Sequence, residues 1–290
     1  MSIKALTKEE QILAARAKEL AESALSRDYE LYVSRFLSPA EQNLYYTSII
    51  RSVPSLRERI FFWGGAIGAD RRVCVILPSF IETWDSPAVE AGRPSFFSRE
   101  REAAMSAAAA VYLPDETYGI TPLKISGSGY ATLTHRDYMG SILGLGVERE
   151  MIGDIVPLDD RNAVVFASSV TAQFIESELM KIGRDTVKVS PAHLGSDYVI
   201  SKKYEEKLII AASARVDAVV AGFTGVSRSD AKSMCLGGLV DVNYITEESP
   251  DRNLAEGDTV SVRGYGKFII DSFAGETRSG RDRIAVRRYV

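Results

Sequence analysis

In this 290-residue sequence, the strongest indication of a binding site is the spacing of three basic residues near the starts of two predicted helices. Arg215 opens the first helix and Arg228 lies in the first turn of the second, where Lys232 follows four residues later on the same side. Positive charges so placed suit the closely spaced phosphates of folded RNA. Ser227, a predicted helix cap, and Ser229 flank Arg228. We therefore take these five residues as candidate RNA-binding residues.

Two short helices and the strands after them must position these side chains. Each predicted helix has apolar residues at helical spacing, namely Val216, Val219, Val220 and Phe223 in the first and Ala231, Met234 and Cys235 in the second. Gly237 and Gly238 end the second helix. Val240 and Val242 alternate as in a strand that ends at Asn243, and a turn at Gly257 precedes a further strand at residues 259–262.

Basic residues continue after this helix pair. Residues 263–290 hold 7 Lys and Arg against 3 Asp and Glu, although the whole chain has a net charge of −4, so any RNA contact must come from a local patch. Asn243, Arg263 and Lys267 complete the candidates in this region. Lys267, between Gly266 and Phe268, either approaches an RNA backbone or belongs to a hairpin with a packed Phe. The spacing of Arg283 and Arg287 predicts a terminal strand with one basic face.

A second candidate contact lies in the middle of the chain. His135 and Arg136 precede a short predicted helix at residues 137–145, whose free backbone amides could hold a phosphate. The alternative is structural, because Asp137 can cap the same amides and Arg136 can pair with Glu148 or Glu150.

The order of predicted elements indicates an α+β protein. Two capping boxes, Thr7 with Glu10 and Ser38 with Glu41, start helices that end near Ser26 and Ser52. We expect a helical N-terminal region at 1–70 and an α/β region at 71–190. The latter contains a β-α-β-β-α-β unit at about 123–190, with a second helix at 170–182 that Gly183 ends, as in ferredoxin-like and RRM-like folds. Residues 191–214 read as a linker with a helix at 202–214, and residues 215–290 as the RNA-binding module.

Two segments of the sequence resemble known families. The stretches RVDAVVAGF (215–223), VSRSDAK (226–232), GGLVDVN (237–243) and EGDTVSVR (256–263) resemble the S4-type (alpha-L) RNA-binding domain. The stretch LTHRDYMGSILGLGVEREMIGDI (133–155) resembles the signature of the bacterial YlmH family, as does the order of the three regions. The resemblance implies a monomeric protein that binds ribosomal RNA and peptidyl-tRNA on the large ribosomal subunit, in ribosome-associated quality control and C-terminal tailing of stalled chains.

Catalytic signatures are weak in this sequence. His135-Arg136-Asp137 lacks the Asn that a kinase loop carries five residues later, since position 142 is Ile. No cluster of carboxylates or thiols surrounds either of the two histidines in the sequence, so we expect neither a metal nor a cofactor. The alternative is an RNA-modifying enzyme, similar to a pseudouridine synthase, that carries an S4-type module.

We expect a reduced cytoplasmic protein that makes no contact with a membrane. Cys74 and Cys235 are too far apart in sequence to form a CxxC pair. The apolar stretch at 103–113 is shorter than the roughly 20 residues that span a bilayer.

Overall fold

The computed structural model describes residues 6–30, 32–79, 118–195 and 198–289, and it divides into two compact units, Met1–Ile200 and Ser201–Val290. The mixture of helices and largely antiparallel sheets confirms the expected α+β class. The predicted α/β region at 71–190 and the apolar stretch at 103–113 fall wholly or partly on residues 80–117, which lie outside the described residues. None of the described helices has the length and apolarity that crossing a membrane demands.

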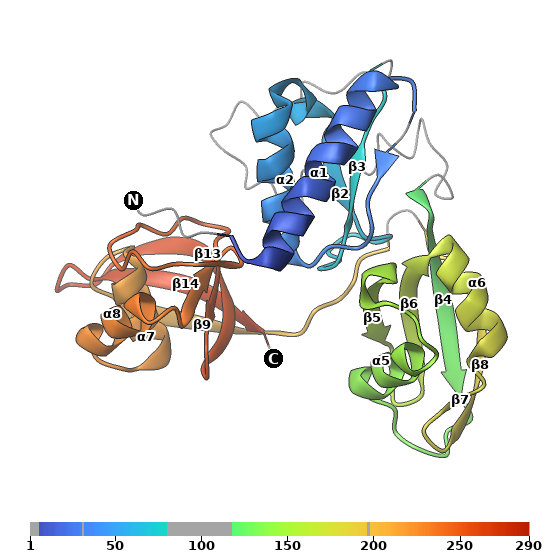
Figure 1. Cartoon of the computed structure of the whole chain (residues 1–290). Coiled ribbons are helices and arrows are strands. Elements are labelled where there is room, and N and C mark those ends of the chain that lie inside the picture. Colours follow the sequence, from blue (N-terminus) through green and yellow to red (C-terminus); the bar gives the residue numbers. More distant parts are fainter. Residues whose placement is uncertain (1–5, 31, 80–117, 196–197, 290) are drawn as a thin grey trace. The chain divides into compact units, whose positions relative to one another are not determined.

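The first unit begins with two helices packed on a three-stranded sheet (Figure 1). Both predicted capping boxes are present: the Thr7 hydroxyl accepts from the Glu10 amide at 3.2 Å, and the Ser38 hydroxyl accepts from the Glu41 amide at 3.4 Å. The elements are α1 (Lys8–Ser26), β1 (Tyr32–Val33), α2 (Pro39–Ser52), the 3-10 helix η1 (Pro54–Arg59), β2 (Ile60–Trp63) and β3 (Val73–Ile76), with strand order β1-β3-β2. The expected helical region at 1–70 therefore also contains strands.

A five-stranded sheet with two helices follows in the same unit. Its elements are β4 (Ile120–Gly127), α5 (His135–Gly144), the 3-10 helix η3 (Arg149–Met151), β5 (Ile152–Pro157), β6 (Asn162–Ser168), α6 (Ser169–Glu178), β7 (Lys181–Ile182) and β8 (Asp185–Pro191). The strand order is β5-β6-β4-β8-β7, so the first and third strands of the expected β-α-β-β-α-β unit are neighbours in the sheet. α5 and α6 pack on one face of it.

The prediction of a helix at 170–182 is wrong at the C-terminal end of that helix. α6 stops at Glu178, and residues 181–182 form β7, which pairs Lys181 with Thr186 and Ile182 with Asp185 in a hairpin. Gly183 has a φ of +57° and belongs to the hairpin turn instead of the helix end. The hairpin is favoured because it buries Ile182 against α5 and α6 in the core.

The two sheets of the first unit pack face to face. Residues of β2 and β3 alternate: Ile60 and Phe62 point toward α1 and α2, whereas Phe61 and Trp63 join a second core with Phe166 of β6. Two sheets with buried faces on both sides explain the nearly continuous apolar runs of these strands.

Polar contacts hold these two sheets together. The Asp154 carboxylate accepts from the Asp70 amide at 2.6 Å and from the Arg71 amide at 3.1 Å. The Arg71 guanidinium donates to the carbonyls of Ile152 at 3.0 Å and Phe36 at 3.1 Å. The N-terminal region is thus one layer of a larger unit and not a separate helical region.

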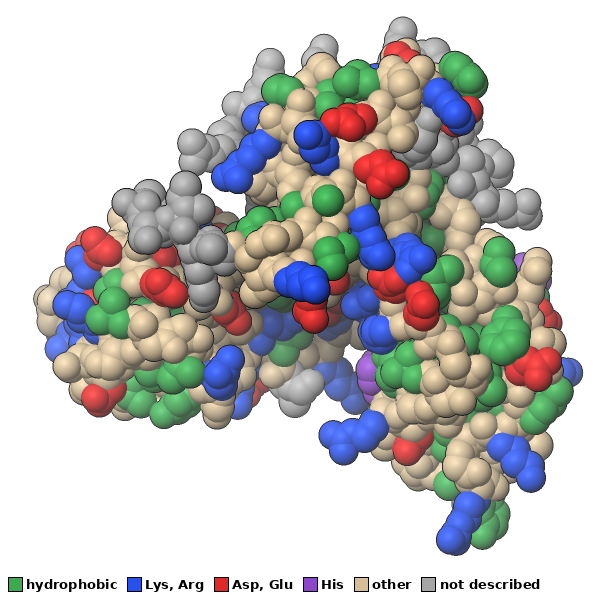
Figure 2. All heavy atoms as spheres, in the orientation of Figure 1, with side chains coloured by type: hydrophobic (Ala, Val, Ile, Leu, Met, Phe, Trp, Pro, Cys, Tyr) green, Lys and Arg blue, Asp and Glu red, His purple; other side chains and the backbone are tan. Residues whose placement is uncertain are grey.

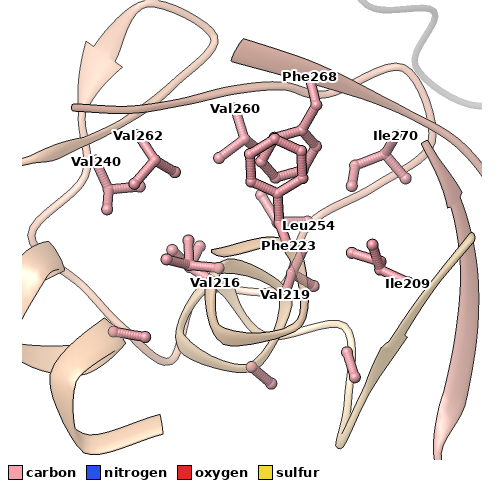
Figure 3. Packing of buried hydrophobic residues seen from close by; sticks show 14 of the residues in the cluster. Ile209, Val216, Val219, Phe223, Val240, Leu254, Val260, Val262, Phe268 and Ile270 are labelled. Atoms are coloured by element: carbon pink, nitrogen blue, oxygen red, sulfur yellow. The ribbon is translucent and has the colours of Figure 1, made fainter. Parts of the chain in front are cut away.

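The second unit is a six-stranded antiparallel sheet with two helices on one face. Its elements are β9 (Tyr204–Ala211), α7 (Val216–Thr224), α8 (Arg228–Leu236), β10 (Val240–Val242), β11 (Ile245–Thr246), β12 (Thr259–Val262), β13 (Gly266–Glu276) and β14 (Asp282–Tyr289), in the order β11-β10-β12-β13-β14-β9. Figure 3 shows the core between helices and sheet, where Phe223 stacks on Phe268 with 3.9 Å between ring centroids.

The helix predicted at 202–214 is a strand in the structure. Residues 204–211 form β9, which pairs along its length with β14, so that Glu205 faces Arg288 and Glu206 faces Arg287. Alternate residues Ile209 and Ala211 enter the core, which is the period of a strand. The predicted terminal strand is confirmed as β14.

Candidate nucleic-acid interface

A tight turn joins α7 to α8. Gly225 ends α7 with a φ of +80°, a conformation that glycine adopts without strain. Ser227 then caps α8: its hydroxyl accepts from the Asp230 amide at 3.1 Å and lies 2.7 Å from the Asp230 carboxylate. The predicted cap is therefore confirmed, and the Ser227 hydroxyl is engaged within the protein. Ser229 is exposed in the first turn.

The buried carboxylate of Asp217 brings two of the predicted basic residues together. Arg215 donates to it through Nε at 3.2 Å and Nη2 at 3.3 Å, and Arg228 donates through Nε at 3.1 Å and Nη2 at 3.3 Å. Only 5% of the Asp217 side chain is exposed, against 38% for Arg215 and 49% for Arg228. Each guanidinium uses one edge for the carboxylate and keeps other N–H groups for a further acceptor.

The environment of Asp217 favours its ionised form. Burial acts to raise the pKa of this carboxyl, but the hydrogen bonds and charges of Arg228 and Arg215 outweigh burial and hold the pKa below its ordinary value. Our sequence reasoning missed Asp217. A signal was present, because Asp217 is a charged residue in the first turn of an otherwise apolar helix, two positions after Arg215.

Lys232 lies one turn beyond Arg228 on α8, as predicted. Its side chain is exposed, and within the described part of the chain it has neither an ion pair nor a hydrogen bond. Arg215, Arg228 and Lys232 together carry three positive charges, of which Asp217 balances one. On the visible surface, Lys and Arg are interspersed with Asp and Glu (Figure 2), which agrees with a local patch instead of a broad basic field.

Asn243 has a structural position in a hairpin turn. It and Tyr244 have φ values of +51° and +64°, as in a type I′ turn between β10 and β11. Its amide nitrogen donates to the Asp258 carboxylate at 2.7 Å, and its side-chain oxygen accepts from the Thr259 amide at 2.9 Å.

Lys267 lies on the face of the sheet opposite to α7 and α8. It pairs with Ser261, whereas the neighbouring Phe268 enters the core, so the hairpin with a packed Phe is what the structure has. The Lys267 ammonium lies 3.9 Å from the ring centroid of Tyr289 and 5.2 Å from that of Tyr244. Arg263 is exposed in the loop between β12 and β13. The sequence therefore grouped residues that the fold places on two faces.

His135 and Arg136 belong to the first unit, where they begin α5 and are exposed. The Asp137 carboxylate accepts from the Thr134 hydroxyl at 2.6 Å and amide at 2.8 Å, which holds the pKa of Asp137 below its ordinary value.

Glu148 and Glu150, the residues suggested as ion-pair partners of Arg136, pair with other arginines instead. Arg35 pairs with Glu148 at 3.1 Å and also with Glu150, and Arg16 reaches Glu150 at 3.6 Å. Arg136 has no ion pair among the described residues.

No group of three His, Cys, Asp or Glu side chains that could hold a metal ion occurs in the described part of the chain. The arrangement around α7 and α8 offers hydrogen-bond donors and positive charge, which are the groups that bind phosphate oxygens.

Comparison with known proteins supports the resemblance seen in the sequence. Residues 114–196 match the family model described as "Putative RNA-binding domain in YlmH". The ribosome-associated protein quality control protein P2 of Bacillus subtilis (strain 168) is 29% identical over 159 residues, which are 55% of this chain and 62% of that protein. The match therefore spans less than two thirds of the length of this relative.

Among solved structures, the cell division protein ylmH from Streptococcus pneumoniae has a TM-score of 0.44 and 15% identity, covering 67% of this chain and 96% of that one. The resemblance to the YlmH family is confirmed, and residues 114–196 carry the YlmH-type domain.

Proposed function

We propose, from the resemblance to the YlmH family, that this chain is a non-catalytic RNA-binding protein of the cytoplasm that acts on the large ribosomal subunit. The name of the Bacillus subtilis relative, a ribosome-associated quality control protein, supports this assignment. The RNA partners would be ribosomal RNA and peptidyl-tRNA, bound by a monomer during C-terminal tailing of stalled nascent chains.

The two units would correspond to two known kinds of RNA-binding module. The strand order β5-β6-β4-β8 is that of a ferredoxin-like, RRM-like fold with the first and third strands adjacent. The order α7, α8, β10 and β12, with basic residues at the starts of both helices, fits the S4-type domain that residues 215–263 resemble.

The observation that carries the proposal is the pair of arginines on Asp217. Two guanidiniums that share one buried carboxylate are fixed side by side before any ligand arrives, so binding costs less side-chain entropy than it would for free arginines. Their remaining N–H groups suit two oxygens of a phosphate or two adjacent phosphates. Lys232, one turn away, would add a third contact.

Sedimentation of the full-length protein with purified large ribosomal subunits tests this proposal. The double variant Arg228→Ala/Lys232→Ala removes two phosphate contacts. The slope of the logarithm of its binding constant against the logarithm of the salt concentration should therefore be smaller by about 2. Arg278→Ala/Arg281→Ala is the matched control, because both residues are exposed in the same unit and the charge loss is equal. Equal co-sedimentation of the two double variants and the wild type would show that α8 is not the binding surface.

His135 and Arg136 would supply a second contact from the first unit. Arg136→Ala should leave the melting temperature unchanged, since Arg136 has no ion pair within the described residues, and should weaken subunit association. Because one phosphate contact is lost, the difference from wild type should shrink as salt is raised.

The non-catalytic assignment has its own test. Ribosomal RNA and tRNA incubated with the protein should contain no new modified nucleotide when digested and analysed by mass spectrometry. A modification that appears with the wild type and disappears in Asp137→Ala would favour the RNA-modifying enzyme instead.

A further inference from the structure

The described residues cover one face of the sheet of β4 to β8 only in part. α5 and α6 pack on its other face, where they form an apolar core with the strands. On the face away from these helices, Val164 and Phe166 of β6 pack beneath Phe61 and Trp63 of the N-terminal sheet. Glycines allow this close approach, since a Cβ at Gly65 would lie 2.6 Å from the Phe166 ring. RRM domains stack bases on this face, and here the half formed by β5 and β6 is occupied by the protein itself.

Three lysines occupy the other half of the same face. On β8, Val187 points into the core with α5 and α6, so the adjacent Lys188 points away from the helices. Lys124 of β4 pairs with Val164, which lies on the helix-free face, and Lys181 of β7 pairs with Thr186. All three lysines are exposed.

The strand register places these lysines in a diagonal row. Ser126 of β4 faces Lys188 and Lys124 faces Ser190, so Lys124 and Lys188 are diagonal neighbours on adjacent strands. Lys181 faces Thr186, two residues before Lys188, and is its diagonal neighbour on the other side. Diagonal neighbours in a sheet are roughly 7–8 Å apart, within reach of one another's long side chains. We call Lys124, Lys188 and Lys181 the lysine row.

The positive charge of the lysine row takes part in no ion pair with the residues that the structure describes. None of the three lysines has an ion pair or hydrogen bond within the described part of the chain. The residues that alternate with them on this face of β4 and β8 are Ile120, Pro122, Ser126, Thr186 and Ser190, none of which carries a carboxylate; Ser126, Thr186 and Ser190, beside the lysines, carry hydroxyl groups. By contrast, in the second unit Lys267 lies over the ring of Tyr289, and Arg287 pairs with the Asp271 carboxylate.

We propose that the lysine row binds the sugar–phosphate backbone of RNA without reading its bases. This inference rests on the proposed RNA-binding function and assigns the contact surface within the YlmH-type domain. Lysine ammonium groups bind phosphates as point charges, and the serine and threonine hydroxyls between them can donate hydrogen bonds to phosphate or ribose oxygens. No aromatic side chain of the described β4, β7 and β8 lies on this face to stack a base.

The test compares two triple variants of the full-length protein. Lys124→Gln/Lys181→Gln/Lys188→Gln removes the row, and Lys8→Gln/Arg51→Gln/Arg57→Gln removes the same charge from exposed positions on the helical side of the same unit. The probes are purified large ribosomal subunits and two RNA hairpins of unrelated sequence, with binding measured between about 0.05 and 0.2 M salt. Thermal unfolding should be the same for both variants.

The row variant should bind both hairpins and the subunit at least tenfold more weakly than the control at the lowest salt, with a salt slope smaller by about 2 to 3 units. A third variant with Arg at all three positions should bind like the wild type, because phosphate binding needs the charge and not the ammonium group. If the row variant and the control variant bind equally well, the proposal that the lysine row binds RNA is overturned, whereas the RNA-binding function of the protein stands.

Two further outcomes are informative. Loss of binding to one hairpin only would overturn the inference that bases are not read. A wild type that binds neither hairpin nor subunit would contradict the proposed function itself, before any variant is compared.

Discussion

Asp217 organises the basic groups at the start of α7 and α8. Its carboxylate receives four N–H donors from Arg215 and Arg228, and it lies almost completely buried. A buried carboxylate is stable only when its charge is paired and its oxygens are hydrogen bonded. The two arginines meet that need and are themselves held near one another. A single acidic residue thus couples the stability of the domain to the geometry of its basic patch.

Asp217→Asn should therefore lower stability in a pH-dependent way. At pH 7 the variant should be about 1–3 kcal/mol less stable, because it loses charged hydrogen bonds to both arginines. The folded pKa of Asp217 is lowered, so its contribution is present above the unfolded pKa of about 3.9 and is lost as the pH falls through the folded value. The stability gap between variant and wild type in urea unfolding should therefore narrow below about pH 4.

Asp251→Asn is the control for this pH profile, because Asp251 is exposed and has no partner within the described residues. It should be as stable as the wild type at every pH. A gap for Asp217→Asn that stays constant from pH 7 to pH 3 would contradict the assigned role of its charge.

At the scale of elements, the segment between β1 and α2 packs on β5 so closely that a side chain at residue 153 would not fit. A Cβ built at Gly153 of β5 would lie 2.7 Å from Cε1 of Phe36 and 3.1 Å from Cβ of Phe166. Both phenylalanines are fully buried, so neither ring has free space to move into. The contact between the N-terminal layer and the YlmH-type domain thus depends on the absence of a side chain at residue 153.

Gly153→Ala should destabilise the first unit by about 1–3 kcal/mol, because the added methyl group would press against the buried Phe36 ring and force that ring and its segment to shift. Gly140→Ala is the matched control: it lies in the middle of α5 with nothing within 4 Å of its Cβ position, and alanine there should stabilise the helix by roughly 0.5–1 kcal/mol. Chemical unfolding monitored by tryptophan fluorescence reports on this unit through Trp63. If Gly153→Ala and Gly140→Ala shift the free energy of unfolding in the same direction, the absence of a side chain at residue 153 is not what the packing depends on.

At the scale of the whole molecule, the chain consists of units with separate cores. The core of the second unit draws on residues from Ile209 to Val286, and none comes from the first unit. The cores of the first unit lie within residues 17–200. Because the described residues of the two units share no core, we expect each unit to unfold in its own cooperative transition.

Residues 201–290 expressed alone should fold and unfold cooperatively. Calorimetry of this fragment should give one transition at the same temperature as one of two transitions of the full-length protein. A fragment whose NMR spectrum lacks dispersed amide resonances would show that the second unit needs the first unit in order to fold.

Local signals in the sequence predicted the elements that depend on neighbouring residues. The capping boxes at Thr7 and Ser38, the Ser227 cap and the spacing of Arg283 and Arg287 act within a few residues, so they can be read from the chain alone. The β-α-β-β-α-β order was predicted for the same reason. The bounds of most of these elements differ from prediction by only a few residues.

The tertiary structure decided what depends on distant residues. Residues 204–211 became a strand because β14, some 80 positions later, offers arginines opposite Glu205 and Glu206 and a core that accepts Ile209. Lys267 moved to the opposite face from Lys232 because strand pairing fixes the direction of every second side chain. The pairing of Asp217 with both arginines and the arrangement of the lysine row were decided by burial and strand register, since charge pairing and exposure are properties of the folded chain.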